Sequence, residues 1–211
     1  MADYKKPDYW QLKARKEGYP ARSVYKLKEM DEKFSLIKPL RPGPSGQEKH
    51  SLRVLDLGAS PGSWSLYVLR KTPGTFLVSV DISPLSRQYD QGLFDVGNFH
   101  FIQGDITDPA VRDSVFSYGP FSLIVSDAAP ATTGNRLIDA ARSLELAETI
   151  VSYAGSALSE NGSLVIKIFQ GGDSAEILKR MRTLFKTAKS YKPQTCRRES
   201  FETYYLGMEK N

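Results

Sequence analysis

Three aspartates stand at the ends of short apolar runs in this sequence of 211 residues. They are Asp81, Asp105 and Asp127. Short apolar runs that alternate with helical patterns predict a parallel sheet, whose strands end at one common edge. We therefore expect the three carboxylates to share the crevice above that edge, where α/β folds bind their ligands. One such aspartate alone would more often cap the next helix, but three in succession favour a binding site.

Lys167 stands inside an apolar run, residues 164–169, that predicts a buried fifth strand. Burying an unpaired ammonium costs free energy, so this lysine needs an acidic partner or a lowered pKa. Asp127, at the end of the preceding predicted strand, could be that partner. Such a charged group in a cleft is a candidate for catalysis. The alternative is a lysine that reaches from the end of its strand to water.

A turn with two glycines, Gly58 and Gly62, joins the predicted first strand, residues 53–57, to a helical pattern near Trp64. Serines occupy positions where a dinucleotide-binding G-x-G-x-x-G turn needs glycine, and no Gly-Lys-Ser/Thr follows, so neither phosphate-binding loop is present. Glycine lets a ligand approach the backbone closely. A glycine turn without any ligand is the alternative.

The spacing between the glycine turn and the next two acids favours a nucleoside. Asp81 lies 23 residues after Gly58, the offset at which an acid can accept hydrogen bonds from ribose hydroxyls. Asp105, one predicted strand further along, is placed to accept a hydrogen bond from an adenine amino group.

Strands and helices alternate along the rest of the chain, as in an α/β fold. The predicted helices include residues 22–34, 137–158 and 174–187. The predicted strands are residues 53–57, 75–80, 99–103, 121–126, 164–169, 188–192 and 202–208. We predict a mostly parallel seven-stranded sheet with helices on both faces and a hairpin of the last two strands at one edge.

The chain is expected to have three parts. Residues 1–38 form a basic N-terminal arm, partly irregular as far as residue 21, followed by a helix. Residues 39–50 are rich in proline and glycine and form a linker loop. Residues 51–211 form the main domain.

Basic residues concentrate near both ends of the chain. Residues 5–28 carry a net charge of +6 and residues 178–198 carry +8, although the whole chain has only +5. Tyrosines and a tryptophan interleave the first cluster. Basic clusters with aromatic residues favour nucleic acid as a partner. Two solvated helix faces are the alternative.

The composition excludes several classes of protein. No apolar run approaches the roughly 18 residues that cross a bilayer, and residues 1–8 lack the apolar core of a secretion signal. One cysteine and two histidines leave almost no ligands for a zinc site or a histidine-based triad. We expect a cytoplasmic monomer that binds neither a membrane nor a metal.

Five motifs occur in a specific order. They are residues 23–27, 56–64, 126–130, 165–171 and 200–204. This arrangement resembles the FtsJ/RrmJ family of RNA ribose 2′-O-methyltransferases, from about residue 9 to residue 207. The resemblance implies a Rossmann-like methyltransferase fold that binds S-adenosylmethionine and RNA and needs no metal.

The resemblance also implies roles for individual residues. Lys167 would take the proton of a ribose hydroxyl, Asp127 and Lys26 would orient the lysine and the hydroxyl, and Glu202 would fix Lys26 or the ribose. The catalytic tetrad of the family falls on Lys26, Asp127, Lys167 and Glu202. The predicted cofactor-binding residues are Gly58, Gly62, Trp64, Asp81, Asp105 and Asp127.

The predicted substrate is a uridine ribose in large-subunit (23S-type) ribosomal RNA. The first alternatives are a tRNA ribose methyltransferase and a non-catalytic RNA-binding factor of ribosome assembly. A methyltransferase acting on a base nitrogen or a protein is another alternative. Amino-N enzymes often carry Asn/Asp-Pro-Pro-Tyr/Phe after the fourth strand, where this chain has Ser-Asp-Ala-Ala-Pro at 126–130.

Overall fold

The computed structural model describes residues 7–38, 52–171, 173–197 and 199–211. The predicted linker at 39–50 lies outside these residues. The elements in chain order are α1 (Tyr9–Lys16), α2 (Val24–Phe34), β1 (Arg53–Leu57), α3 (Ser63–Lys71), β2 (Phe76–Asp81), η1 (Leu93–Asp95), β3 (Phe99–Gln103), α4 (Pro109–Ser117), β4 (Phe121–Ser126), α5 (Arg136–Ala157), β5 (Leu158–Phe169), α6 (Ser174–Leu184), β6 (Phe185–Tyr191) and β7 (Glu202–Lys210).

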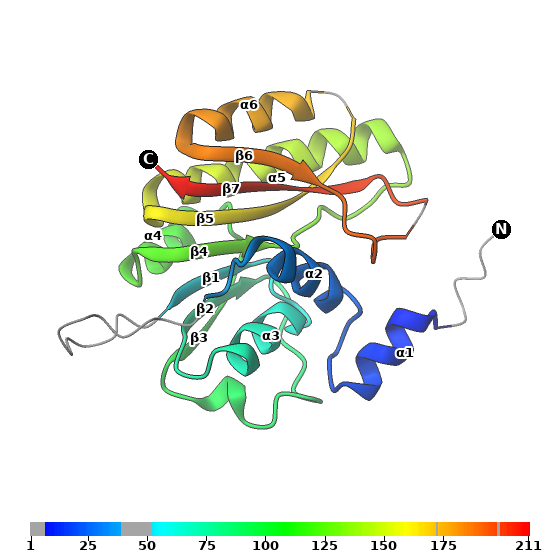
Figure 1. Ribbon diagram of the computed structural model, residues 1–211, viewed down its shortest axis with the longest axis vertical. Helices are drawn as coiled ribbons and strands as arrows, with labels where there is room; N and C mark the ends of the chain where they lie inside the picture. The colour runs from blue at the N-terminus through cyan, green and yellow to red at the C-terminus, as the bar shows by residue number, and fades with distance from the viewer. Residues whose placement is uncertain (1–6, 39–51, 172, 198) are drawn as a thin grey trace.

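The strands form one sheet in the order β3-β2-β1-β4-β5-β7-β6 (Figure 1). Neighbours from β3 to β5 pair in parallel, whereas β7 runs antiparallel to both β5 and β6. This confirms the predicted mostly parallel seven-stranded sheet with a hairpin at one edge. The chain crosses from the outer strand β3 back to β4, beside β1. The strand order therefore reverses between β1 and β4, which is where α/β sheets form a ligand crevice.

Helices cover both faces of the sheet because its central strands are apolar on both sides. In β1, Val54 belongs to the core shared with α1, α2 and α3, and Leu55 belongs to the core shared with α4, α5 and α6. Figure 1 shows α2 and α3 in front of the strands and α5 behind them. Helices α2 and α3 thus pack on the face that carries Val54, and α1 lies to one side of them.

Helix α1 corrects the expectation of a partly irregular arm. The side chain of Asp8 accepts a hydrogen bond from the backbone N–H of Gln11, and the side chain of Gln11 accepts one from the N–H of Asp8, each at 2.9 Å. This reciprocal capping box satisfies two N–H groups at the start of the helix. Ala14, in the same helix, is buried in the core.

Two later boundaries also differ from the predicted ones. Strand β5 begins at Leu158 rather than at 164, because the residues around Asn161 form an irregularity within the strand. Asn161 has a φ of +58°, and the pairing of β5 with β4 shifts register beside it. Helix α6 ends at Leu184 rather than at 187, and β6 follows at once. The strand order is unaffected.

Candidate active site

The glycine turn after β1 lies where the ends of β1 and β4 approach each other. Gly58 has a φ of +77°, and a β-carbon there would lie 2.4 Å from the β-carbon of Ala128. Gly62 has a φ of +102°, and a β-carbon there would lie 2.9 Å from the ring of Phe94. Local packing therefore requires glycine at both positions, whether or not a ligand binds.

A cavity of about 610 Å³ opens above the carboxyl ends of the strands. Asp81, Asp105 and Asp127 all line it, together with Gly58, so the expected convergence of the three strand-end carboxylates is confirmed. Its wall includes the segment after β4 and one side of α5. The residues of that wall are Ala128, Ala129, Pro130, Ala131, Arg142, Glu145, Leu146 and Thr149.

Two of the three carboxylates are fixed by backbone N–H groups close by. Asp81 accepts from the N–H of Ser60 and from that of Ser83, each at 2.8 Å. Asp105 accepts from both the N–H and the hydroxyl of Thr107, and these bonds hold the pKa of Asp105 below its usual value. Each ionised carboxylate has about four acceptor positions. Both groups can therefore still accept hydrogen bonds from a ligand.

Trp64 lies elsewhere than the prediction of a cofactor contact implies. Its side chain is 2 % exposed, and its indole N–H donates to the carbonyl of Ser23 at 2.9 Å. The indole ring lies 6.0 Å from the ring of Tyr204. Trp64 and Gly62 are not among the residues that line the cavity. The Trp64 side chain instead fixes the start of α2, and the cofactor role of these two residues stays a prediction.

The structure brings the four tetrad residues together from α2, the end of β4, β5 and β7. Lys167 Nζ lies 3.2 Å from Asp127 Oδ1 and also donates to the Asp127 carbonyl. Lys26 Nζ donates to Glu202 Oε2 at 2.8 Å and lies 4.0 Å from Asp127 Oδ1. The expected pairing of Lys167 with Asp127 is therefore present. The catalytic roles stay predictions.

The charges of the tetrad set its protonation states. Burial alone would raise the pKa of Asp127, but Lys167 and Lys26 outweigh it and hold that pKa below its usual value. Burial alone would lower the pKa of Lys26, but Asp127 and Glu202 outweigh it and hold that pKa above its usual value. Asp127 is thus kept as a carboxylate and Lys26 as an ammonium.

Tyr204 is a further member of the site that the sequence reasoning did not assign. Its hydroxyl donates to Asp127 Oδ1 at 2.6 Å, and its ring is fully buried. Burial and the charge of Asp127 raise the pKa of Tyr204 well above its usual value, so the hydroxyl keeps its proton. The period of two in a strand could have revealed it, because Tyr204 shares the face of Glu202 in β7.

Asp56, in β1, lies buried beneath the crevice and is 1 % exposed. It accepts a hydrogen bond from the hydroxyl of Ser65 at 2.7 Å, whereas its other carboxylate oxygen has no partner among the described residues. Burial, followed by the charges of Asp127 and Asp81, raises the pKa of Asp56 to about 7. A buried carboxyl group with a raised pKa therefore lies in β1, close enough to Asp127 and Asp81 for their charges to act on it.

The structure joins the two predicted basic clusters only in part. Where β6 meets α2, Lys33 lies 4.3 Å from the ring of Tyr191, and Lys189 lies 4.2 Å from the ring of Phe34. Helix α6, which carries other basic residues of the C-terminal cluster, packs with α5 on the opposite face of the sheet. The basic residues of the C-terminal cluster are therefore divided between β6 and α6, and their role in binding nucleic acid stays a prediction.

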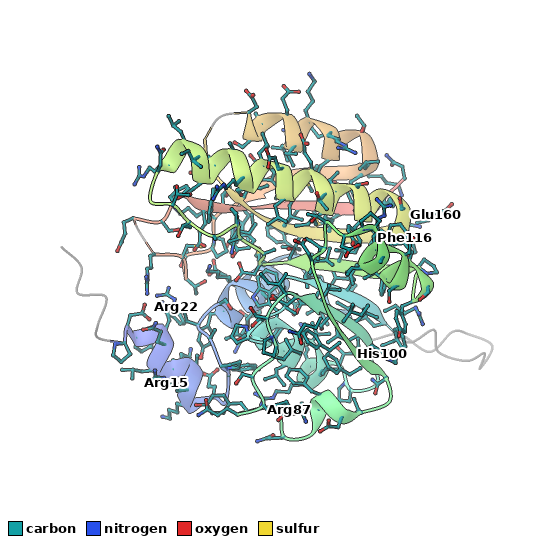
Figure 2. The ribbon with its side chains drawn as sticks, turned by 180° about the vertical axis from the view of Figure 1, so that it is seen from behind. Arg15, Arg22, Arg87, His100, Phe116 and Glu160 are labelled. Atoms are coloured by element: carbon teal, nitrogen blue, oxygen red, sulfur yellow. The ribbon has the colours of Figure 1, made fainter. Side chains whose placement is uncertain are left out.

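Arginines fasten the N-terminal helices to the segment that leads into β7. Arg22 forms an ion pair with Asp8 and donates to the carbonyl of Thr195. Arg197 also lies 3.4 Å from Asp8. Figure 2 shows Arg22 next to α1. These contacts tie the two ends of the chain together beside the tetrad.

A family model described as FtsJ-like methyltransferase matches residues 19–210. This chain belongs to that family. A Treponema denticola relative of this FtsJ-like methyltransferase is 47% identical over 209 residues, which cover 98% of this chain and 96% of the relative. A Borrelia garinii relative is 44% identical over 200 residues, 95% of each chain. Both relatives are named Ribosomal RNA large subunit methyltransferase E.

Solved structures of low sequence identity share the fold of this FtsJ-like methyltransferase. A Plasmodium falciparum protein described as a ribosomal RNA methyltransferase has a TM-score of 0.70 at 22% identity, covering 91% of this chain and 98% of the other. A chain of a fibrillarin/Nop5p complex has a TM-score of 0.54 at 19% identity, covering 77% and 74%. The predicted family, fold and methyltransferase class are confirmed.

No helix in the described ranges is long and apolar enough to span a membrane. Within the same part of the chain, no group of three or more His, Cys, Asp or Glu side chains is arranged to hold a metal ion.

Proposed function

We propose that this FtsJ-like methyltransferase transfers a methyl group from S-adenosylmethionine to the 2′-hydroxyl of a uridine ribose in large-subunit ribosomal RNA. The observation that carries the proposal is the position of Asp127. This aspartate lines the cavity and lies 3.2 Å from Lys167. A methyl donor bound in the cavity and a ribose hydroxyl beside Lys167 would then meet next to Asp127. The names of the relatives support the ribosomal substrate.

The cavity residues fit S-adenosylmethionine. Ribose hydroxyls and an adenine amino group are hydrogen-bond donors, and Asp81 and Asp105 each keep acceptor capacity toward the cavity. When bound, this cofactor supplies a methyl group that its positively charged sulfur has already activated. The task left to the protein is to position the hydroxyl and to remove its proton.

The charged groups around Lys26 and Lys167 support different roles for these two lysines. Because the pKa of Lys26 is raised by Asp127 and Glu202, Lys26 stays an ammonium that can hold the hydroxyl oxygen. Lys167 is then the base, and its neutral amine takes the hydroxyl proton as the methyl group is transferred. Asp127 holds Lys167 in place, and Tyr204 holds Asp127.

Methyl transfer to defined RNAs tests the proposal. Large-subunit ribosomal RNA, the particles that contain it, and tRNA, all from a strain without the gene, would be incubated with the protein and labelled S-adenosylmethionine. We expect label in a single uridine 2′-O-position of large-subunit RNA and none with Lys167→Arg. Label in tRNA would favour the alternative substrate. RNA binding without any transfer would favour an assembly factor that has lost catalysis.

We also expect the enzyme to act as a cytoplasmic monomer.

A further inference from the structure

An aromatic pair and an arginine form a rim next to the tetrad. The rings of Phe169 and Phe201 lie 4.7 Å apart, and the guanidinium of Arg136 lies 5.6 Å from the ring of Phe201. We call these three residues the aromatic rim. Arg136 is exposed, Phe201 is partly exposed, and Phe169 is buried beneath them. The next residue of α5, Leu137, is 78 % exposed.

The strand register places the aromatic rim beside the reacting groups. Phe169 lies two residues after Lys167 in β5, so the two side chains share one face of the sheet. Phe169 pairs with Glu202, and Phe201 directly precedes Glu202. The rim thus lies next to two of the four tetrad residues.

The fold does not depend on the exposed part of the rim. The N–H of Gln170 donates to the carbonyl of Phe201 at 2.8 Å, and this bond already joins the two segments. The N–H of Phe169 donates to the hydroxyl of Ser143 at 3.0 Å, which joins β5 to α5. Neither of these bonds involves the side chain of Phe201 or Arg136.

From this placement we infer that the aromatic rim binds an unpaired nucleobase of the RNA. The inference rests on the proposed function, because it places the base close to the ribose that receives the methyl group. Unpaired bases stack on aromatic rings and on the planes of arginine side chains, and cations among the aromatic groups attract the phosphates. The rim would hold the RNA strand so that one ribose stays over Lys167 and Lys26.

An apolar segment of a partner protein is the other class of ligand that such a rim could take. The exposed Leu137 would suit it. The guanidinium of Arg136 favours a polyanion instead. The experiment below separates the two classes.

The probe is a single-stranded oligoribonucleotide that contains the fluorescent base 2-aminopurine, with the same sequence in a duplex for comparison. Stacking quenches the fluorescence, and anisotropy reports affinity. We expect Phe201→Leu to bind the single strand about tenfold more weakly, with less quenching. We expect Phe201→Trp to keep both signals and Arg136→Gln to lose about threefold in affinity. Duplex binding should change little.

Phe76→Leu is a matched control. Phe76 lies 4.1 Å from the guanidinium of Arg53. These two residues form a similar pair at the starts of β2 and β1, away from the carboxyl ends of the strands. This variant should bind the single strand like the wild type. If Phe201→Leu also binds and quenches like the wild type, the nucleobase site is wrong, and the rim belongs to a protein partner. If the wild type quenches the probe but transfers no methyl group to any RNA, the proposed function fails while the base site stands.

Discussion

The two halves of the crevice are built in different ways. In the cavity, Asp105 is held by Thr107, two residues away, and Asp81 is held in part by Ser83. In the tetrad, Lys26 is held by Glu202, which is 176 residues away in the sequence. Two carboxylates of the cavity thus depend in part on local turns, whereas the contact between Lys26 and Glu202 requires α2 and β7 to come together. We therefore expect changes in the cavity to act separately and changes in the tetrad to act together.

The largest effect is expected at Lys167. Lys167→Arg keeps a cation but removes the base, because an arginine side chain does not give up its proton. The rate of single-turnover methyl transfer should fall by about 10²–10⁴-fold, while RNA and S-adenosylmethionine still bind. Lys71→Arg, which changes a lysine paired with Asp31 away from the crevice, should keep the wild-type rate. Near wild-type rates for Lys167→Arg across a pH series would show that Lys167 supplies only charge.

A change in the cavity should act on the cofactor alone. Asp81→Ala removes the proposed acceptor of two ribose hydroxyls, which should cost about 1.5–3 kcal/mol of binding free energy, or roughly ten- to a hundredfold in affinity. Calorimetry with S-adenosylmethionine measures this loss. Asp108→Ala, which removes the N-cap of α4, is the control and should keep the affinity. Unchanged affinity in a folded Asp81→Ala variant would remove Asp81 from the site.

A smaller effect is expected at Tyr204. Tyr204→Phe keeps the buried ring but loses the hydrogen bond to Asp127, so the transfer rate should fall about tenfold with the cofactor affinity unchanged. In the double variant Tyr204→Phe/Lys26→Met, the fall in transfer rate should be clearly smaller than the product of the two single falls, because both residues act through Asp127. Simple multiplication of the two effects would show that the tetrad is not a coupled unit.

The smallest effect on turnover is expected at Asp56, where the change should act on stability instead. The pKa of Asp56 is raised from 3.8 to about 7, so the folded state binds this proton more tightly than the unfolded state does. The contribution of Asp56 to stability is therefore largest below pH 4 and is lost as the pH rises toward 7. The loss is about 1.4 kcal/mol for each pH unit between the two pKa values.

Asp56→Asn removes this titration. Denaturant unfolding of both proteins from pH 4 to pH 8 should show the wild type losing stability relative to the variant up to about pH 7 and running parallel to it above. Curves that stay parallel from pH 4 to pH 7 would show that the Asp56 carboxyl keeps an ordinary pKa.

The sequence predicted those parts of the site that follow from strand ends. An acid at the end of a parallel strand must face the crevice, so the convergence of Asp81, Asp105 and Asp127 could be predicted without coordinates. The partner of Lys167 could also be predicted, because a buried ammonium needs a carboxylate close by. The contact of Lys26 with Glu202 came only from the family resemblance, since no local rule joins a residue in α2 to one in β7.

The remaining differences have local physical causes. Helix α1 was missed because its basic composition drew attention away from the Asp8 and Gln11 spacing of a capping box. The sequence could not predict that α6 covers the face of the sheet opposite α2, because the number of charges along a segment does not tell which face that segment covers. Trp64 was assigned to the cofactor by resemblance, yet its indole packs against the start of α2.

The place of β7 in the sheet has a consequence for the order in which the enzyme matures. The segments that follow β1 to β4, together with α5, form the wall of the cavity and leave the ribosome before β7 does, because a chain emerges from its N-terminus onward. Glu202 and Tyr204 arrive only with β7, which must insert between β5 and β6. A nascent chain could therefore hold its cofactor pocket early, while Lys26 and Asp127 still lack their partners. If the proposed tetrad is catalytic, methyl transfer requires β7 to be in place.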